Sequence, residues 1–372
     1  MITISLCMIV KNEEATLKRC LTAISDVVDE IIIIDTGSTD QTKKIASKFT
    51  DKVIDFVWID DFSTARNFAF SQATKEYILW LDADDLVTPK NKALLLQLKR
   101  ELDSNVDSVM MHYHILFDDK DRPTYSVQRN RLVKRKAGFK WVGFVHEFLD
   151  VYGNIMISDI SIHHKKIKAH TDRNLMIFRK HIQKGTKFSP RELFYYGNEL
   201  FDHSFFVEAL KVYKQFLQKE DSWIEDQIAA CIKMANCYAA LYDTEMQLQS
   251  LLWSLRYDKP RAEICCRLGI TFLNLNDVEK AIFWYELALT LGPPPAIRGL
   301  IYDEAAWSWL PHLQLCVCYD QKGDFKKALY HNNQALKYRP DHPSIIHNLK
   351  YLTDKISKNP VTDISTQQLN NS

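Results

Sequence analysis

The sequence predicts two domains of different class: an α/β domain with a mostly parallel sheet, followed by an all-α domain of helical repeats. Short β-branched runs alternate with amphipathic stretches up to about residue 110, and loops with unusual chemistry follow these runs. After Arg191, strand signals give way to helical periodicity, and the 372 residues suffice for two cores. The expected parts are an α/β domain over 1–170, a linker helix over 171–190, repeats over 191–350 and a polar, disordered tail over 351–372.

The first domain is predicted to begin with strands that alternate with helices. Each expected strand is a short β-branched or aromatic run, and each expected helix has apolar residues at helical spacing. In chain order we expect strand 2–10, helix 17–24, strand 31–34, helix 40–49, strand 53–58, helix 65–73 and strand 77–81. Such an alternation indicates βαβ units, and ligands of these sheets bind at the carboxyl ends of the strands.

Composition excludes several classes of protein. The 48 basic and 47 acidic residues nearly cancel, so the chain has no electrostatic footprint for nucleic acid and no polybasic membrane anchor. We expect no signal peptide, and no integral membrane segment, which would need about 20 apolar residues. The eight cysteines lack the spacing of a zinc knuckle, which predicts buried free thiols in a cytoplasmic protein.

Three carboxylates, Asp82, Asp84 and Asp85, directly follow the predicted strand over 77–81. Hard carboxylate oxygens suit Mg²⁺ or Mn²⁺, and these ions usually combine one or two protein carboxylates with substrate phosphates. The alternative is a solvated acidic turn. Three other chemically unusual loops also follow predicted strands, and this coincidence favours a diphosphate–metal site.

Two of these other loops carry further candidates. Asp35 opens the segment Asp35-Thr-Gly-Ser-Thr-Asp40, which also suits a tight turn and a helix cap. Capping alone accounts well for the end of that segment and less well for Asp35. Arg66 lies at the start of the third helix, where its guanidinium could bind a phosphate bidentately or form an i,i+4 ion pair.

The four segments together resemble a known family. Met8-Ile-Val-Lys-Asn-Glu-Glu14, Ile34-Asp-Thr-Gly-Ser-Thr-Asp40, Ser63-Thr-Ala-Arg-Asn67 and Leu81-Asp-Ala-Asp-Asp85 occur in the order and spacing of family 2 glycosyltransferases, which have the Rossmann-like GT-A fold. Trp141-Val-Gly-Phe-Val-His-Glu147 resembles a segment of the subgroup that carries C-terminal tetratricopeptide repeats. That subgroup includes the sublancin-type peptide S-glycosyltransferases.

The resemblance implies roles for particular residues. Asp84 would be the main metal ligand, and His164 is the best match for the histidine that often completes the metal site. A surface position is the alternative for His164, and a strand would point His163 to the opposite face. The expected contacts to a nucleotide-sugar donor come from Ile9, Val10, Glu13, Asp35, Thr36, Arg66, Asp82 and Ala83. Many members have a second aspartate, which contacts the base, where this chain has Thr36. We still expect recognition of uracil, but without the contact from that carboxylate.

The family reaction inverts the anomeric centre by in-line displacement, and a base takes the acceptor proton. The candidates for the base are Glu147 and Asp85, although His146 and Glu147 could instead only orient a loop, and Asp85 could instead support the metal ligands. The indole of Trp141, close to Glu147 in the sequence, could stack on a sugar or acceptor. A thiol acceptor, whose pKa is about 8.5, would need little help from a base.

The second half resembles a tetratricopeptide array of about four units. Small and aromatic residues recur at the offsets of a repeat of about 34 residues, and the match is best over 262–295 and poor over 228–260, where Gln247 takes a small-residue position. Such arrays form concave surfaces that bind peptides. A plain helical domain is the alternative, and the repeats could also pair two subunits into a homo-oligomer.

The leading hypothesis is an inverting, metal-dependent hexosyltransferase that uses a nucleotide sugar, expected to be a UDP-sugar. Its acceptor would be a cysteine, serine or threonine side chain of a peptide or protein that the repeats help to dock. One alternative is transfer to a cell-envelope glycan. A non-catalytic scaffold is the other alternative, but Arg66, Asp82, Asp84 and His164 argue against it.

Overall fold

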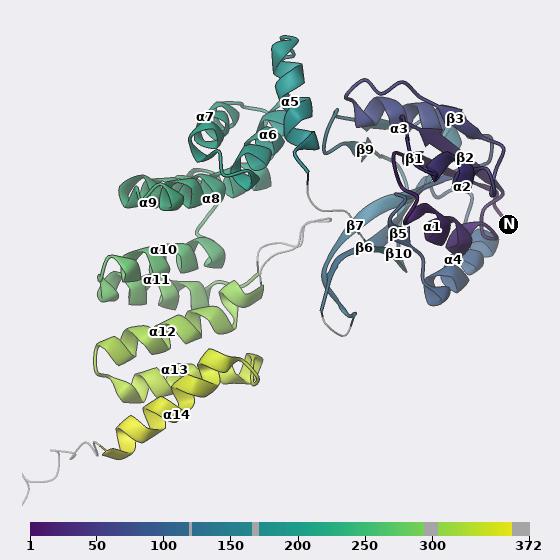
Figure 1. Ribbon diagram of the computed structural model, residues 1–372. Helices are drawn as coiled ribbons and strands as arrows, with labels where there is room; N and C mark the ends of the chain where they lie inside the picture. Colours follow the sequence, from purple (N-terminus) through teal and green to yellow (C-terminus); the bar gives the residue numbers. More distant parts are fainter. Residues whose placement is uncertain (119–120, 166–170, 294–303, 359–372) are drawn as a thin grey trace, which may run out of the picture. The chain divides into compact units, whose positions relative to one another are not determined.

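The computed structural model describes residues 1–118, 121–165, 171–293 and 304–358. The described residues divide into two compact units, of which the first contains residues up to 195 and the second contains residues 196–293 and 304–358. Figure 1 shows the first as a mixed α/β unit and the second as a series of helices. The predicted classes of both halves are confirmed.

An eight-stranded mixed sheet forms the centre of the first unit. Its order is β3-β2-β1-β4-β7-β6-β10-β5; the first four strands are mutually parallel, and β7 runs antiparallel to both of its neighbours. The strands are β1 (Ile4–Val10), β2 (Glu30–Asp35), β3 (Val53–Asp55), β4 (Tyr77–Trp80), β5 (Asp85–Leu86), β6 (Ser108–Phe117), β7 (Pro123–Lys134) and β10 (Ile155–His164). A small hairpin of β8 (Lys140–Val142) and β9 (Phe148–Asp150) is separate from the sheet.

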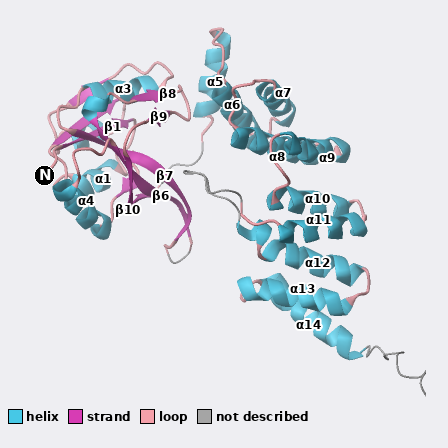
Figure 2. Cartoon of the chain, turned by 180° about the vertical axis from the view of Figure 1, so that it is seen from behind, coloured by secondary structure: helices cyan, strands magenta, loops and turns pink. Residues whose placement is uncertain are grey.

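Helices cover both faces of this sheet, as Figure 2 shows for α1 and α4 on one side and α3 on the other. Successive residues of a strand point to opposite faces, so Leu6 and Met8 of β1 pack toward α1 and α4, whereas Cys7 packs toward α3. The helices are α1 (Leu17–Ile24), α2 (Thr42–Ala46), α3 (Phe62–Ser71), α4 (Pro89–Glu101) and α5 (Arg173–Gln183), the last within the expected linker. Asp61 and Thr88 cap α3 and α4 with their side chains.

The alternation of strands and helices predicted for the first 81 residues is confirmed, although the bounds of several elements differ. The expected strand 53–58 ends at Asp55, and the expected helix 40–49 is limited to Thr42–Ala46. Asp40 accounts for the later start of that helix, because its carboxylate binds both the backbone N–H and the hydroxyl of Thr42.

In the second unit, consecutive helices pair and stack. Within the described residues the pairs are α6 (Pro190–Asp202) with α7 (Phe206–Leu217), α8 (Ile224–Ala240) with α9 (Thr244–Trp253), α10 (Ala262–Asn274) with α11 (Val278–Thr290), and α12 (Trp309–Gln321) with α13 (Phe325–Tyr338). Helix α14 (Pro343–Lys358) follows and extends past residue 350, where we expected the repeats to end. Residues 359–372 of the expected tail and the segment 294–303 lie outside the described residues.

Close approach of small residues to rings holds the helix pairs together. A methyl group at Gly269 would meet ring carbons of Tyr285 at 2.7 Å, and one at Gly197 would meet Tyr213 at 2.5 Å. Ala281 and Ala288 are fully buried in the same way as Ala209. The small and aromatic positions predicted from the repeat pattern are therefore packing positions.

All eight cysteines are buried and free, as the sequence predicted. Burial raises the pKa of Cys231, Cys237 and Cys316 to about 12. These thiols are therefore uncharged near neutral pH. No helix in the described part of the chain combines the length and the apolar character needed to cross a membrane.

Candidate active site

A cavity of the first unit opens at the carboxyl ends of β1, β2 and β4, and it has a volume of about 450 Å³. It collects residues from loops far apart in the sequence, as expected for a sheet of this topology. Its walls include most of the predicted site residues: Ile9, Val10, Glu13, Thr36, Arg66, Asp82, Ala83, Asp84, Glu147 and His164. Asp35 and Asp85 do not line it.

The acidic loop after β4 is fixed by its own backbone and by its neighbours. Asp85 donates its backbone N–H to the carbonyl of Asp82 at 3.0 Å, and the Asp85 carboxylate accepts the N–H of Asp82 at 2.9 Å. The carbonyl of Asp84 accepts a hydrogen bond from Arg19 and another from the backbone of Lys165, each at 3.1 Å. The loop is therefore a built turn and not a freely solvated one.

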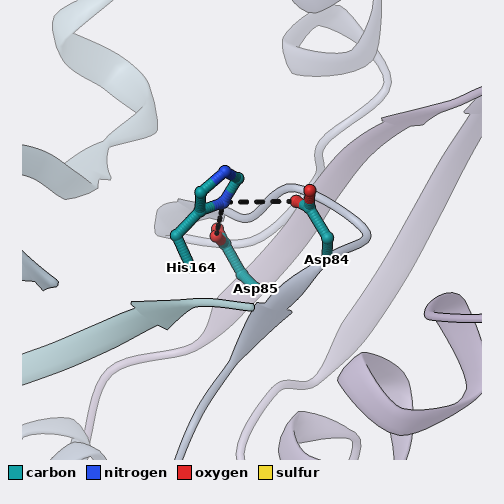
Figure 3. Close-up of side chains that lie close together, drawn as sticks. All are labelled: Asp84, Asp85 and His164. Atoms are coloured by element: carbon teal, nitrogen blue, oxygen red, sulfur yellow. Dashed lines mark ion pairs between the residues drawn. The ribbon is translucent and has the colours of Figure 1, made fainter. Parts of the chain in front are cut away.

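Asp84, Asp85 and His164 form a group whose possible ligand atoms lie within 4.8 Å of one another. Figure 3 shows one imidazole nitrogen facing both carboxylates, with His164 Nδ1 3.5 Å from Asp84 and 3.7 Å from Asp85. The last residue of β10 reaches this loop because β10 pairs with β5, opposite Asp85. Two carboxylates and an imidazole are a donor set that divalent cations accept.

The charges of this group are unbalanced. Burial raises the pKa of Asp84, and the neighbouring charges of Asp82, Asp85 and Glu13 raise it further, against the opposing effect of His164. Burial disfavours the imidazolium form of His164, yet the hydrogen bond and charges of the surrounding carboxylates raise its pKa overall. Both shifts indicate a site that attracts positive charge.

Asp85 is fully buried, and its partners differ from those of a catalytic base. Its carboxylate lies 3.0 Å from the guanidinium of Arg131, which is also fully buried, and accepts a hydrogen bond from the Tyr113 hydroxyl at 2.9 Å. Both carboxylate oxygens are therefore engaged below the cavity surface. Of its two predicted roles, support of the metal ligands agrees with this position.

Arg66 joins the two sides of the cavity. Its guanidinium contacts Asp82 at 2.8 Å and Glu147 at 2.6 Å, and it packs over the rings of Trp80 and Trp141. These two carboxylates raise the pKa of Arg66 despite its burial, so the charge is permanent. The same charge keeps the pKa of Asp82 below its usual range, although burial opposes this effect.

The expected role of Trp141 is wrong. Its side chain is 5% exposed and packs edge-on against Trp80, so the indole cannot stack on a sugar or acceptor in the cavity. Asn67 exchanges two hydrogen bonds of 2.9 Å with the backbone of Trp141. Trp141 thus anchors the segment that carries Glu147 to α3.

Asp35 and Thr36 take different positions. Asp35 is fully buried, and its carboxylate accepts the backbone N–H groups of Gly37 and Ser38, which fastens the turn after β2. Gly37 has φ of 101°, a conformation that favours glycine. Thr36 faces the cavity, and its hydroxyl donates to the carbonyl of Val10 at 3.1 Å. Of this pair, Thr36 lines the cavity.

His163 and His164 point to opposite faces of the sheet, as the strand pattern predicted. His163 packs against the rings of His114 and Phe117 at 5.1 and 5.2 Å. The pairing of β10 with β5 places His164 opposite Asp85 and His163 opposite Leu86.

Several residues of the site lie outside any sequence motif from which they could be predicted. Arg131 and Tyr113 lie on the long strands β7 and β6, where nothing in the local sequence separates them from structural residues. Arg173 and Asn174, at the start of α5, also line the cavity. Arg173 packs over the ring of Phe62 at 4.6 Å, so the linker helix contributes to the site.

Comparisons with known proteins agree with this geometry. Residues 5–160 match the model of glycosyl transferase family 2, and residues 262–294 match a tetratricopeptide repeat. A TPR repeat-containing protein of Synechococcus elongatus is 37% identical over 152 residues, which are 40% of this chain and 36% of that protein. The glycosyltransferase SunS of Bacillus subtilis is 32% identical over 212 residues, which are 53% of this chain and 49% of that protein.

An uncharacterised glycosyltransferase of Rickettsia felis is 31% identical over 111 residues, or 30% of this chain and 35% of that protein. The chain thus spans about half or less of the length of these relatives. The matched ranges include all four strand-end loops and the best-matching repeat. Residues 5–160 are therefore a family 2 glycosyltransferase domain with the GT-A type of α/β fold, and a tetratricopeptide repeat region follows it.

Proposed function

We propose that the chain is an inverting, metal-dependent glycosyltransferase that moves a sugar from a UDP-sugar to a cysteine, serine or threonine side chain of a peptide or protein. One observation carries the proposal: a single cavity joins the strand ends of β1 and β2, the Asp84–His164 group and Glu147. A donor, a cation and an acceptor base at these residues would share one space, as a displacement reaction requires.

The donor set fits Mg²⁺ or Mn²⁺. Asp84 and His164 would hold the ion, which supplies positive charge to the diphosphate leaving group. The cluster contains more negative than positive side chains: four carboxylates (Asp82, Asp84, Asp85 and Glu147) and two guanidinium groups (Arg66 and Arg131).

Thr36 supports recognition of uracil by a route that differs from a carboxylate. Its hydroxyl proton is used by the carbonyl of Val10, which leaves the oxygen lone pairs as acceptors on the cavity side. The N3–H of uracil is a donor that matches this acceptor, whereas cytosine has no hydrogen at N3. The nucleotide would lie along Ile9, Val10 and Glu13.

Glu147 is the proposed base. The acceptor oxygen or sulfur forms a bond to the anomeric carbon while the bond from that carbon to the diphosphate oxygen breaks, and the acceptor proton moves to the Glu147 carboxylate. Arg66 holds Glu147 and Asp82 at a fixed separation across this point. The nucleoside diphosphate leaves with the bonding electron pair.

The experiment is a panel of nucleotide sugars with Mn²⁺ and a library of peptides that contain Cys, Ser or Thr, followed by mass spectrometry. We expect one sugar to add to a peptide at the expense of a UDP-sugar. The matched variants are Asp84→Asn, which should abolish transfer, and Asp55→Asn, which alters an exposed aspartate outside the cavity. Full transfer by Asp84→Asn would exclude the metal assignment, and the absence of transfer and hydrolysis with every donor would exclude the activity.

A further inference from the structure

A chain of four side chains runs beneath the cavity, from the sheet interior to His164. The Arg131 guanidinium lies 3.0 Å from the Asp85 carboxylate, and the Tyr113 hydroxyl lies 2.9 Å from Asp85 and 2.7 Å from His164 Nδ1. Arg131 and Asp85 are fully buried, and Tyr113 is 9% exposed. Of these groups, His164 alone lines the cavity.

The positions of the protons in this series of four side chains can be assigned by counting hydrogen-bond donors and acceptors. Asp85 is an ion beside Arg131, so its carboxylate accepts and does not donate. A hydroxyl has one proton, and Tyr113 must give it to Asp85, because otherwise two oxygen atoms would face each other at 2.9 Å without a hydrogen. The Tyr113 oxygen then accepts from His164, which requires a proton on Nδ1.

Arg131, the first residue of this series of side chains, is itself held in a fixed position. Its guanidinium lies between the rings of Trp80 and Tyr113, at 3.8 and 4.3 Å from their centres, and it also donates to the carbonyl of Trp80. Nε and Nη2 of Arg131 have no hydrogen-bond partner among the described residues, and the two aromatic faces take the place of one. A planar cation is needed in such a space, which a lysine would not fill.

We propose that Arg131, Asp85 and Tyr113 are positioning residues that hold His164 in the tautomer with the proton on Nδ1, so that Nε2 carries the lone pair for the cation. This inference rests on the proposed metal-dependent function. It is not the assignment that proximity suggests, because Nδ1 is the ring nitrogen that faces Asp84 and Asp85 (Figure 3). It also gives Asp85 the role of an anchor, and neither that of a ligand nor that of a base.

The two assignments predict opposite results for Tyr113→Phe, which removes one hydroxyl and keeps the ring over Arg131. If Nε2 binds the ion, loss of the hydroxyl releases the tautomer and weakens binding by about tenfold, the usual effect of a lost outer-shell partner. If Nδ1 binds the ion, the hydroxyl competes with it, and the variant should bind the ion as well or better.

The matched control is Tyr77→Phe, which also removes a buried hydroxyl hydrogen bond, of 2.7 Å to the carbonyl of Val106, but outside the cavity. Affinity for Mn²⁺ in the presence of UDP is measured by electron paramagnetic resonance, and melting temperature is measured for each protein. We expect both variants to melt alike and Tyr113→Phe alone to lose affinity. If both variants lost the same affinity for Mn²⁺, the loss would reflect lower protein stability, and the inference would be overturned.

A second measurement needs no variant. Nitrogen-15 NMR of the metal-free, full-length protein, at a pH where His164 is neutral, distinguishes the two tautomers, and His164→Gln identifies the signal. We expect the Nδ1–H tautomer, and the Nε2–H tautomer would overturn the inference. If wild-type protein fails to bind Mn²⁺ with UDP, the proposed function is wrong. The NMR measurement still tests the tautomer of His164 independently of that result.

Discussion

Arg66 keeps two carboxylates of the site at opposite sides of one cation. Its contact with Asp82 reaches the side of the cavity that we assign to the donor, and its contact with Glu147 reaches the side that we assign to the acceptor. Because Arg66 is nearly buried and packs on Trp80 and Trp141, it cannot swing away. The separation of Asp82 from the proposed base Glu147 is therefore set by one rigid residue.

Replacement of the proposed base separates the acceptor classes. Glu147→Gln keeps the shape of the side chain but removes its ability to take a proton. We expect transfer to Ser or Thr peptides to fall by about 10²-fold or more, because a hydroxyl needs a base. Transfer to Cys peptides should fall by less than about tenfold at pH 8.5, because about half of a free thiol is ionised there.

The measurement is kcat/KM with paired peptides that differ only at the acceptor residue. Glu192→Gln, which alters a glutamate that caps its own helix outside the cavity, serves as the control. Equal losses for the thiol and hydroxyl peptides would contradict the role of Glu147 as a base and leave it a structural partner of Arg66.

Protons and the proposed cation would compete at Asp84 and His164, and this fixes the sign of the expected pH dependence. The pKa of His164 is raised above 6.5 and that of Asp84 above 3.8, so both hold protons to higher pH than usual. Their contribution to the stability of the metal-free protein is present at low pH and decreases as the pH rises through the raised values. Bound metal needs both groups deprotonated.

We therefore expect the increase in melting temperature caused by Mn²⁺ and UDP to be small at about pH 6 and larger at about pH 8. Differential scanning fluorimetry in buffers of constant ionic strength measures it. His164→Gln should flatten the pH dependence. A stabilisation by Mn²⁺ that stays constant over this range in wild-type protein would contradict the competition.

At the scale of elements, the sheet topology explains why the sequence predicts so much of the site. Asp84 follows β4 and His164 ends β10, and the carboxyl ends of strands in such a sheet converge, so the topology explains a meeting that the family resemblance had implied. Asp85 could not be assigned in the same way, because its role depends on Arg131 and Tyr113. Those residues lie on long strands after residue 107 whose pairing register includes several irregularities.

Trp141 illustrates a second limit of the sequence. Its position in a motif indicates proximity to the site, but burial depends on Trp80 and Phe70, which pack against its ring at 4.7 and 5.9 Å. A motif therefore locates a segment and does not tell which face of a side chain is free. Asp35 shows the same limit, since its turn consumes its carboxylate.

In the helix pairs, the contact of Gly269 with Tyr285 gives a test of packing. Gly269→Ala places a methyl group within 2.8 Å of three ring carbons, so we expect a loss of about 1–3 kcal/mol of stability despite the better helix propensity of alanine. Ile270→Ala, at a partly exposed neighbour on the same helix, should cost about 0.5 kcal/mol or less. Urea unfolding measures both. Equal costs would contradict the close contact.

At the scale of the whole molecule, we assign donor binding to the first unit and docking of the acceptor to the repeats of the second unit. We expect a chain that ends after His203 to bind Mn²⁺ and UDP but to lose transfer to peptides, because the acceptor needs the repeats. This end keeps α6, whose Arg191 and Tyr195 contact His146 beside the proposed base. Calorimetry measures binding, mass spectrometry measures transfer, and circular dichroism verifies folding. Peptide transfer at the full-length KM would refute the docking role.

The burial of all eight thiols has a practical consequence for the choice of assay. A folded protein with shielded, uncharged thiols gives no rapid colour with a disulfide reagent such as Ellman's. A peptide with one free cysteine would supply the whole early signal, and S-glycosylation would remove it. The consumption of acceptor could thus be followed continuously in the presence of a large amount of the protein. Any protein that unfolds during the assay would expose its own thiols and be detected as additional colour.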